Sequence, residues 1–317
     1  MRIRLALFFM LSAIPVQARE VATFSIVARD ARTGELGVAV ASRFFSVGSV
    51  VPYAQAGAGA VATQANANVT YGPRGLELLA RGATAQETLQ VLLRTDPDTK
   101  GRQVGIVAAD GSSATYTGPS ANAWAGGRNG PNYAVQGNIL AGEAVVIALE
   151  KTFLETKGSL AHRMYAALVA GDAAGGDSRG RQSAALLVVK EGAGFNGFSD
   201  RAIDIRVDDH LQPFKELGRL LDYAEMNYAW NEGWTAFRQK RYPAALEAQE
   251  RAAALAPENP ELLYDLAVIR LAAGKCPEAL AALQKALRLN PKLKKQASGD
   301  KDLDALRGDP AFQALMK

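Results

Sequence analysis

The sequence predicts an α+β protein in two parts, a sandwich of two sheets covered by helices and then an all-α repeat domain. Strands, two helices, strands, two helices and strands follow one another before residue 210. Near His210 the composition changes from Gly, Val, Ala and Ser to Leu, Ala, Glu and Arg at helical spacing. A repeat of 34 residues follows. We therefore place the domains at 19–210 and 211–317, after a leader at 1–18.

Short apolar or alternating runs predict the strands of the first domain. They cover 23–28, 36–42, 57–64, 103–109, 113–117, 133–140, 182–189 and 202–207. The charged turn at 29–35 and Asp110-Gly111 each join two of these runs, which indicates β-hairpins and antiparallel sheets. Leucine-rich segments at 73–81, 85–94, 142–156 and 159–170 predict helices that cover the outer faces. Two sheets face to face between two helix layers accommodate this order.

The repeat in the second domain rests on six pairs of positions, each 34 residues apart, which is the period of tetratricopeptide repeats. The pairs are Gly233 and Ala267, Tyr242 and Cys276, Pro243 and Pro277, Ala245 and Ala279, Ala252 and Ala286, and Pro257 and Pro291. A helix over 211–228 and the tail at 302–316 are expected to cap the two units. Such repeats bind a protein or peptide partner, and the alternative is a stabilising appendage.

The first residues have the three parts of a secretory signal peptide. Arg2 and Arg4 precede an apolar run from Leu5 to Val16, and Ala18 closes a small-residue cleavage pattern. We expect a periplasmic or secreted protein, with an uncleaved membrane anchor as the alternative. No later stretch reaches the roughly 18 apolar residues that a membrane span requires, so no stable membrane insertion is expected.

The composition also excludes several classes of site. Cys276 is the only cysteine, and His162 and His210 lie in no ligand-spaced motif. We therefore expect neither a metal site nor a cofactor. The net charge of +4 comes without a dense run of Lys and Arg, which argues against a nucleic-acid partner.

Thr23 is the candidate catalytic residue, because a hydroxyl on a strand at a new N-terminus can use its own α-amine as a general base. A cut after Ala18 leaves residues 19–22 ahead of Thr23, whose nitrogen is then an amide and not a base. Freeing Thr23 requires a second cleavage at the Ala22–Thr23 bond. The alternative is an ordinary strand hydroxyl.

Charged residues beside this strand are candidates for binding a substrate. Ser42 and Arg43 end the neighbouring strand, where Arg43 could bind a substrate carboxylate or form an ion pair with the protein. Asp177 and Arg179 lie in a glycine-rich turn and are expected to pair at the rim of the site.

Amide side chains form the second candidate group. Gln64 and Asn66 follow the third strand, and Gln136 and Asn138 flank Gly137 in a later one. Side-chain amides both donate and accept, and a glycine lets a substrate approach the backbone N–H, so the group could hold an amide or an oxyanion. The alternative is that these side chains satisfy loop backbone.

Seven blocks of the first domain resemble a bacterial family numbered 1028 among the domains of unknown function. They cover 23–28, 37–43, 59–65, 71–75, 135–140, 176–184 and 204–210. That family is similar in fold to the N-terminal nucleophile hydrolases. The resemblance implies a four-layer αββα sandwich, possible hydrolysis of an amide bond in a small peptide-like or amino-acid-derived substrate, and Thr23 as the nucleophile. A binding protein without catalysis, which recruits a partner through its repeats, is the alternative, and a homo-oligomer is possible.

Overall fold

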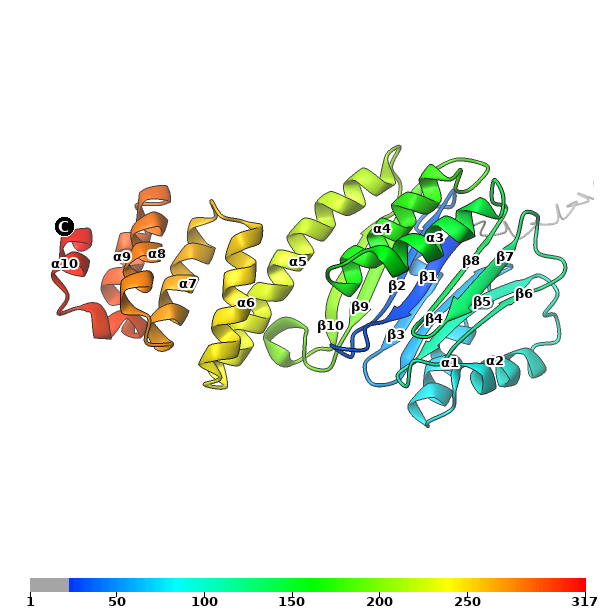
Figure 1. Cartoon of the computed structure of the whole chain (residues 1–317), viewed down its shortest axis with the longest axis horizontal. Coiled ribbons are helices and arrows are strands. Elements are labelled where there is room, and N and C mark those ends of the chain that lie inside the picture. The colour runs from blue at the N-terminus through cyan, green and yellow to red at the C-terminus, as the bar shows by residue number, and fades with distance from the viewer. Residues whose placement is uncertain (1–22) are drawn as a thin grey trace, which may run out of the picture.

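The computed structural model describes residues 23–317, so the signal peptide expected at 1–18 lies outside the described residues. Two antiparallel sheets form the first part of the described chain (Figure 1). The larger sheet has the spatial order β10 (Arg201–Val207), β9 (Ser183–Val189), β2 (Leu36–Ser42), β1 (Thr23–Arg29), β8 (Tyr133–Asn138) and β7 (Gly126–Gly130). The smaller sheet has the order β3 (Pro52–Gln55), β4 (Gly59–Ala65), β5 (Arg102–Ala108) and β6 (Ser113–Thr117).

Helices cover the outer faces of both sheets, which gives the predicted four layers (Figure 1). The smaller sheet carries α1 (Tyr71–Ala80) and α2 (Ala85–Arg94), and the larger sheet carries α3 (Ala144–Glu155) and α4 (Leu160–Ala173). Two short 3-10 helices, η1 (Val47–Ser49) and η2 (Phe195–Gly197), lie in loops of this part. The prediction of an αββα sandwich is confirmed.

The side chains of the central strands alternate between two apolar cores, as the pleat requires. Phe24 and Ile26 on β1 belong to the core beneath α3 and α4. Val27, on the opposite face of β1, packs between the sheets with Ala62 of β4 and Val107 of β5. All five side chains are 2% exposed or less. The odd-numbered residues of β1 therefore face the second sheet.

The register of β1 places its first residue between two others at the same end of the sheet. Thr23 pairs with Ser42 of β2 on one side and with Asn138 of β8 on the other. At the far end of the same strand, Arg29 pairs with Leu36. The chain enters the described part of the sheet at a central strand.

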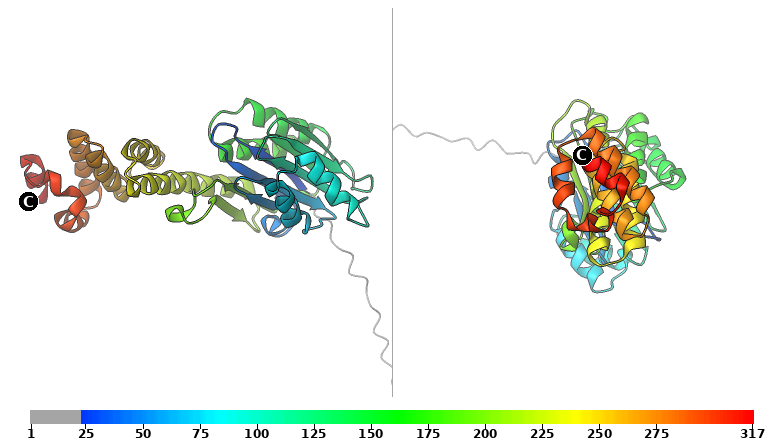
Figure 2. Two further views of the ribbon diagram at one scale, coloured as in Figure 1. Left: turned by 90° about the horizontal axis from the view of Figure 1, so that it is seen from below. Right: turned by 90° about the vertical axis from the view of Figure 1, so that its left-hand side faces the viewer.

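The second part is a row of helices that leads away from the sandwich and places the C-terminus at the far end of the molecule (Figures 1 and 2). Its elements are α5 (Pro213–Arg238), α6 (Tyr242–Leu255), α7 (Pro260–Ala272), α8 (Cys276–Leu289), α9 (Leu293–Gly299), the 3-10 helix η3 (Lys301–Leu306) and α10 (Pro310–Met316). The bounds of α6 and α8 differ by the predicted 34 positions at both ends. Ala245, Ala252, Ala279 and Ala286 are fully buried where the helices approach one another, which confirms the predicted repeat.

One helix, α5, runs from the sandwich into the repeats. The sequence predicts a separate helix over 211–228, but α5 continues to Arg238 and supplies the first helix of the first repeat. It packs against β10 and, in its second half, against α6, where Asn231 also bonds the loop that carries η2. Leu217 and Leu221 fix its first half in the core of the sandwich. Within residues 23–317 no helix combines the length and the apolar character that crossing a membrane requires.

Two strands, β3 and β7, have no counterpart in the prediction. β7 reads Gly-Gly-Arg-Asn-Gly and is held by its backbone pairing with β8, which leaves no apolar pattern in the sequence. β3 is half-exposed at the edge of its sheet and begins at Pro52. Edge strands tolerate both proline and polar side chains, so neither strand has the alternation of a buried one.

Candidate active site

The space between the sheets becomes polar towards the end where Thr23 lies. On β1 the inward positions change from Val27 to Ser25 and Thr23. On β8 they change from Ala134 to Gln136 and Asn138. All four polar side chains are fully buried. Because the interior of a sandwich is ordinarily apolar, polar groups on successive inward positions need a physical explanation.

The smaller sheet contributes polar groups to the same end. Gln64 follows Ala60 and Ala62 on the inward face of β4, and Gln103 precedes Gly105 and Val107 on β5. Both glutamines are fully buried. We call Ser25, Gln64, Gln103, Gln136 and Asn138 the inter-sheet amide cluster.

The members of the cluster hydrogen-bond one another across the gap between the sheets. Ser25 Oγ donates to Gln64 Oε1 at 2.6 Å and receives Gln136 Nε2 at 2.6 Å. Gln103 Oε1 accepts from both Gln64 Nε2 and Asn138 Nδ2 at 2.9 Å. These bonds offset the cost of burying five polar side chains, and they tie the two sheets together at this end.

Gly105 makes room for this network. A Cβ atom at this position would lie 2.1 Å from Oε1 of Gln136, closer than any side chain tolerates. The glycine on β5 therefore allows the amide of Gln136 to lie flat across the strand.

One polar atom of the cluster is left without a partner. Oδ1 of Asn138 is buried and accepts no hydrogen bond within residues 23–317. Asn138 is the cross-strand neighbour of Thr23, so their side chains share one face of the sheet. A buried acceptor without a donor costs about 1–3 kcal/mol, which a donor group arriving beside Thr23 would recover.

Thr23 itself is held by hydrogen bonds through both its side chain and its backbone carbonyl. Its Oγ1 donates to Oγ of Ser42 at 3.3 Å, and its carbonyl accepts from Nε2 of Gln64 at 3.2 Å. The residue is fully buried and lines none of the described pockets. A substrate can reach its hydroxyl only after this end of the strand is uncovered.

Arg43, Asp177 and Arg179 lie together just beyond Ser42. Asp177 is 6% exposed and accepts the backbone N–H of Arg43 at 2.8 Å and Nη2 of Arg179 at 2.9 Å. The guanidinium of Arg43 donates to the carbonyl of Arg179 at 3.3 Å and forms no ion pair within the described chain. Asp177 therefore anchors the loop, while the charge of Arg43 stays available.

Arg43 lines a pocket of about 650 Å³ with Arg181, Gln182, Asp209, His210, Leu211 and Gln212. Arg181 is paired with Asp172 at 2.6 Å, and Asp209 accepts from Gln182 at 3.2 Å. The guanidinium of Arg43 is the charge in this pocket best placed for an incoming anion, because its neighbours are already engaged. The pocket suits a carboxylate.

Asn66 lies outside the amide cluster. It follows β4 in a loop where its carbonyl accepts from Nη1 of Arg102 at 2.7 Å. Arg102 also donates to Asp96 at 3.0 Å, and Asn68 and Tyr71 bind the same carboxylate at 2.9 and 2.8 Å. Burial alone would raise the pKa of Asp96, but the donors around it hold the pKa well below its usual value. This group supports the loop after β4.

The structure thus brings Thr23, Ser42, Gln64, Gln136 and Asn138 to one end of the sandwich, with Arg43, Asp177 and Arg179 at its rim. Gly137 lies between Gln136 and Asn138, and its carbonyl accepts from Nε2 of Gln103 at 2.7 Å. Sequence reasoning missed Gln103, which bonds both Gln64 and Asn138. The signal available was its place two residues before Gly105, in step with inward Val107.

Fold and site together define a two-part protein, an αββα sandwich with a polar inner end joined to tetratricopeptide-like repeats. Residues 23–217 match the model of a family of unknown function, DUF1028, and the chain belongs to that family. Residues 234–307 match a tetratricopeptide repeat model.

Among solved structures, the chain is similar to a crystal structure of a DUF1028 protein from Silicibacter pomeroyi. The two share 28% sequence identity and a TM-score of 0.59, over 64% of this chain and 86% of the other. None of the curated proteins compared with the chain matches its sequence. These matches establish the family, the fold and the repeats of the chain.

Proposed function

We propose that the chain is an exported hydrolase that cleaves an amide bond in a small, peptide-like or amino-acid-derived substrate, with Thr23 as the nucleophile. The observation that carries the proposal is the unpartnered Oδ1 of Asn138 beside Thr23, at the end of a fully buried amide cluster. An amine that arrives beside Thr23 would satisfy this acceptor, and it is the position of Asn138 next to Thr23 that distinguishes it from other buried atoms without partners, such as Oε1 of Gln249.

The proposed chemistry begins with removal of the residues before Thr23, which converts its amide nitrogen into an α-amine. The Oγ1 of Thr23 attacks the substrate carbonyl carbon, and the α-amine takes the hydroxyl proton. The C–N bond of the substrate breaks, the proton passes to the leaving amine, and an ester forms on Thr23. Water then hydrolyses the ester, which releases the acid and restores the hydroxyl and the amine.

Cluster and rim have separate roles in this scheme. Oδ1 of Asn138 accepts a hydrogen bond from the α-amine of Thr23 and orients it towards the hydroxyl. Gln64 and Gln136 keep Asn138 and Thr23 in register through the network around Ser25. Arg43 binds a carboxylate of the substrate in the pocket beside Ser42, which selects amino-acid-derived amides.

The experiment compares three proteins: a chain that starts at Thr23, the same chain preceded by Ala22, and the Thr23→Ala variant of the first. Each is incubated with dipeptides and N-acyl amino acids, and the released amine is measured. We expect turnover from the first protein alone. Thr63→Ala serves as the matched control, because Thr63 is a buried strand hydroxyl that faces α1 and hydrogen-bonds Asn68 instead.

Turnover by Thr23→Ala, or no turnover by the chain that starts at Thr23, would reject the nucleophile. The second candidate function is a binding protein without catalysis, favoured by the complete burial of Thr23 in the described chain. Its repeats would recruit a protein or peptide partner. N-terminal sequencing of the exported protein separates the two, since a mature chain that begins only at Arg19 leaves no α-amine on Thr23.

A further inference from the structure

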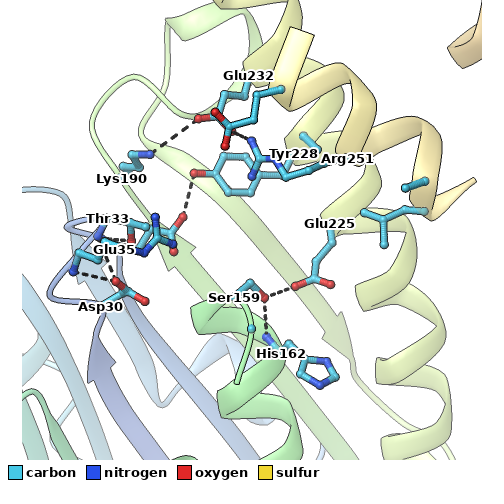
Figure 3. A pocket seen from close by; sticks show the side chains of 16 residues that line it. Asp30, Thr33, Glu35, Ser159, His162, Lys190, Glu225, Tyr228, Glu232 and Arg251 are labelled. Atoms are coloured by element: carbon cyan, nitrogen blue, oxygen red, sulfur yellow. Dashed lines mark hydrogen bonds and ion pairs between the residues drawn. The ribbon is translucent and has the colours of Figure 1, made fainter. Parts of the chain in front are cut away.

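A pocket of about 570 Å³ lies where the sandwich meets the repeats, a size typical of small-molecule sites. We call it the junction pocket (Figure 3). It lies at the end of β1 away from Thr23, beyond Arg29, and is therefore about 20 Å along the strand from the proposed nucleophile. Its lining comes from the turn between β1 and β2, the start of α4, the end of β9, and α5 and α6.

Direct bonds between the two parts fix the walls of the pocket (Figure 3). Tyr228 of α5 donates its hydroxyl to Oε1 of Glu35 at 2.9 Å. Glu232 of α5 forms ion pairs with Lys190 at 3.9 Å and with Arg251 of α6 at 2.6 Å. Ser159, at the start of α4, donates to Glu225. The pocket is thus held open between two packed bodies and is not a gap between loose ones.

Glu35 presents a carboxylate oxygen without a described donor in the pocket. It is 8% exposed, and its only described side-chain hydrogen bond is the one from Tyr228 to Oε1, so Oε2 has no donor within residues 23–317. Burial, and then the negative charges of Glu35 and Glu232, raise the pKa of Tyr228, which keeps it a neutral donor. Oε2 of Glu35 is not among the buried atoms of the described chain that lack a partner, so it is open to the pocket and a ligand can reach it.

Among the described residues that line the pocket, carboxylates without an ion pair outnumber cations without one. Glu225 and Glu247 also line it, and neither forms an ion pair in the described chain. Lys190 and Arg251 both pair with Glu232, and Arg32, which also lines the pocket, forms no ion pair in the described chain, so three carboxylates without an ion pair (Glu35, Glu225 and Glu247) face one such arginine. A ligand that brings a positive charge would therefore find unpaired carboxylates on both walls.

The apolar residues that line the pocket indicate the shape of ligand that would fit. Ala229, Ala254 and Leu255 supply an apolar strip beside the carboxylates, and Leu255 is 50% exposed. An aliphatic stem that ends in an ammonium group matches such a surface, because the methylenes pack on apolar side chains while the charge meets a carboxylate.

We propose that the junction pocket binds an aliphatic ammonium group, carried either by a free polyamine or by a lysine side chain of a peptide, with Glu35 and Glu225 as its anions. The ammonium donates to Oε2 of Glu35 and spans towards Glu225 on the opposite wall. The site is separate from Thr23 and does not depend on the proposed hydrolysis.

Isothermal titration calorimetry of the full chain with spermidine and with N-acetyl-lysine methylamide tests the proposal. We expect at least one of the two to bind, with an affinity that falls as NaCl rises from 50 to 300 mM. Glu35→Gln should weaken binding at least tenfold, because glutamine keeps the acceptor for Tyr228 and removes the charge. Tighter binding of spermidine assigns a free polyamine, and tighter binding of the blocked lysine assigns a peptide.

Glu258→Gln is the matched control, since Glu258 is an exposed glutamate paired with Lys285 outside the pocket. Glu225→Gln is a second variant, on the other wall of the pocket. It should weaken binding to the same extent, and it serves as a test even if Glu35→Gln perturbs the contact with Tyr228. Absence of binding by both probes would overturn the proposal. So would equal affinity for the wild-type protein and both pocket variants.

Discussion

Replacing Gln103 by leucine measures how strongly the amide cluster holds the two sheets together. Leucine is close in volume, so the change removes hydrogen bonds and leaves the packing nearly intact. Asn138 Nδ2 loses its described partner outright, and Gln64 Nε2 keeps only backbone carbonyls at 3.2 and 3.5 Å. Each buried polar group left unsatisfied costs about 1–3 kcal/mol, so we expect the free energy of unfolding to fall by about 2–5 kcal/mol.

Gln249 provides a matched comparison inside the same chain. It is also fully buried, but Nε2 makes a single bond of 3.3 Å to the carbonyl of Leu262, and Oε1 has no partner within residues 23–317. Gln249→Leu removes an orphaned atom together with a weak bond. Its free energy of unfolding should therefore stay within about 1 kcal/mol of the wild type.

Unfolding in guanidinium chloride gives the change in the free energy of unfolding for both variants, provided that the sandwich and the repeats are followed separately. In a Trp124→Phe background the fluorescence of Trp230 and Trp234 follows the repeats, and in a background with Trp230 and Trp234 replaced by phenylalanine the fluorescence of Trp124 follows the sandwich. The reasoning is refuted if Gln103→Leu costs no more than Gln249→Leu. In that case the network would be an arrangement of polar groups without consequence for stability.

Two further predictions concern buried carboxylates. Asp96→Ala leaves Arg102 without its partner and should cost about 3–5 kcal/mol in urea unfolding, whereas Glu77→Ala, which breaks an exposed pair, should cost under about 1 kcal/mol; equal costs would contradict this. Because the folded pKa of Asp96 is lowered, its contribution is present above the unfolded pKa of about 3.9 and is lost as the pH falls below it. Asp265 behaves in the opposite way, since burial raises its pKa although the indole N–H groups of Trp230 and Trp234 lower it. The stability of the wild type relative to Asp265→Asn should therefore decline from pH 4 to pH 7, and a rise would exclude this assignment.

The sequence predicts those parts of the fold whose signal is local. The two hairpins follow from an alternating run, a charged turn and a second run, and the repeats follow from alanines at 34-residue spacing that are fully buried. β7 escapes prediction because its five residues contribute backbone hydrogen bonds and almost no apolar surface. The length of α5 escapes because its contacts change from sandwich to repeats halfway along, so its apolar face changes direction.

The sequence predicts most residues of the candidate site but not how they come together. Thr23, Gln64, Gln136 and Asn138 stand out as polar residues on strands, but their convergence depends on how two sheets overlap, which no local pattern encodes. Gln103 at the start of β5 is predicted from the sequence as a solvent-facing strand end, and its role appears only when Gln64 of β4 and Asn138 of β8 are placed beside it. The junction pocket depends on Glu35 and Tyr228, which lie 193 positions apart.

The continuous helix α5 connects the sandwich to the repeats rigidly. Its 26 residues span about 39 Å without a flexible joint between the sandwich and the repeats. A tilt of about 10° at the sandwich would displace the far end of a helix of that length by about 7 Å and carry the repeats with it. Because α5 also forms one wall of the junction pocket, a partner bound to the repeats and a ligand bound in that pocket would both act on this one helix.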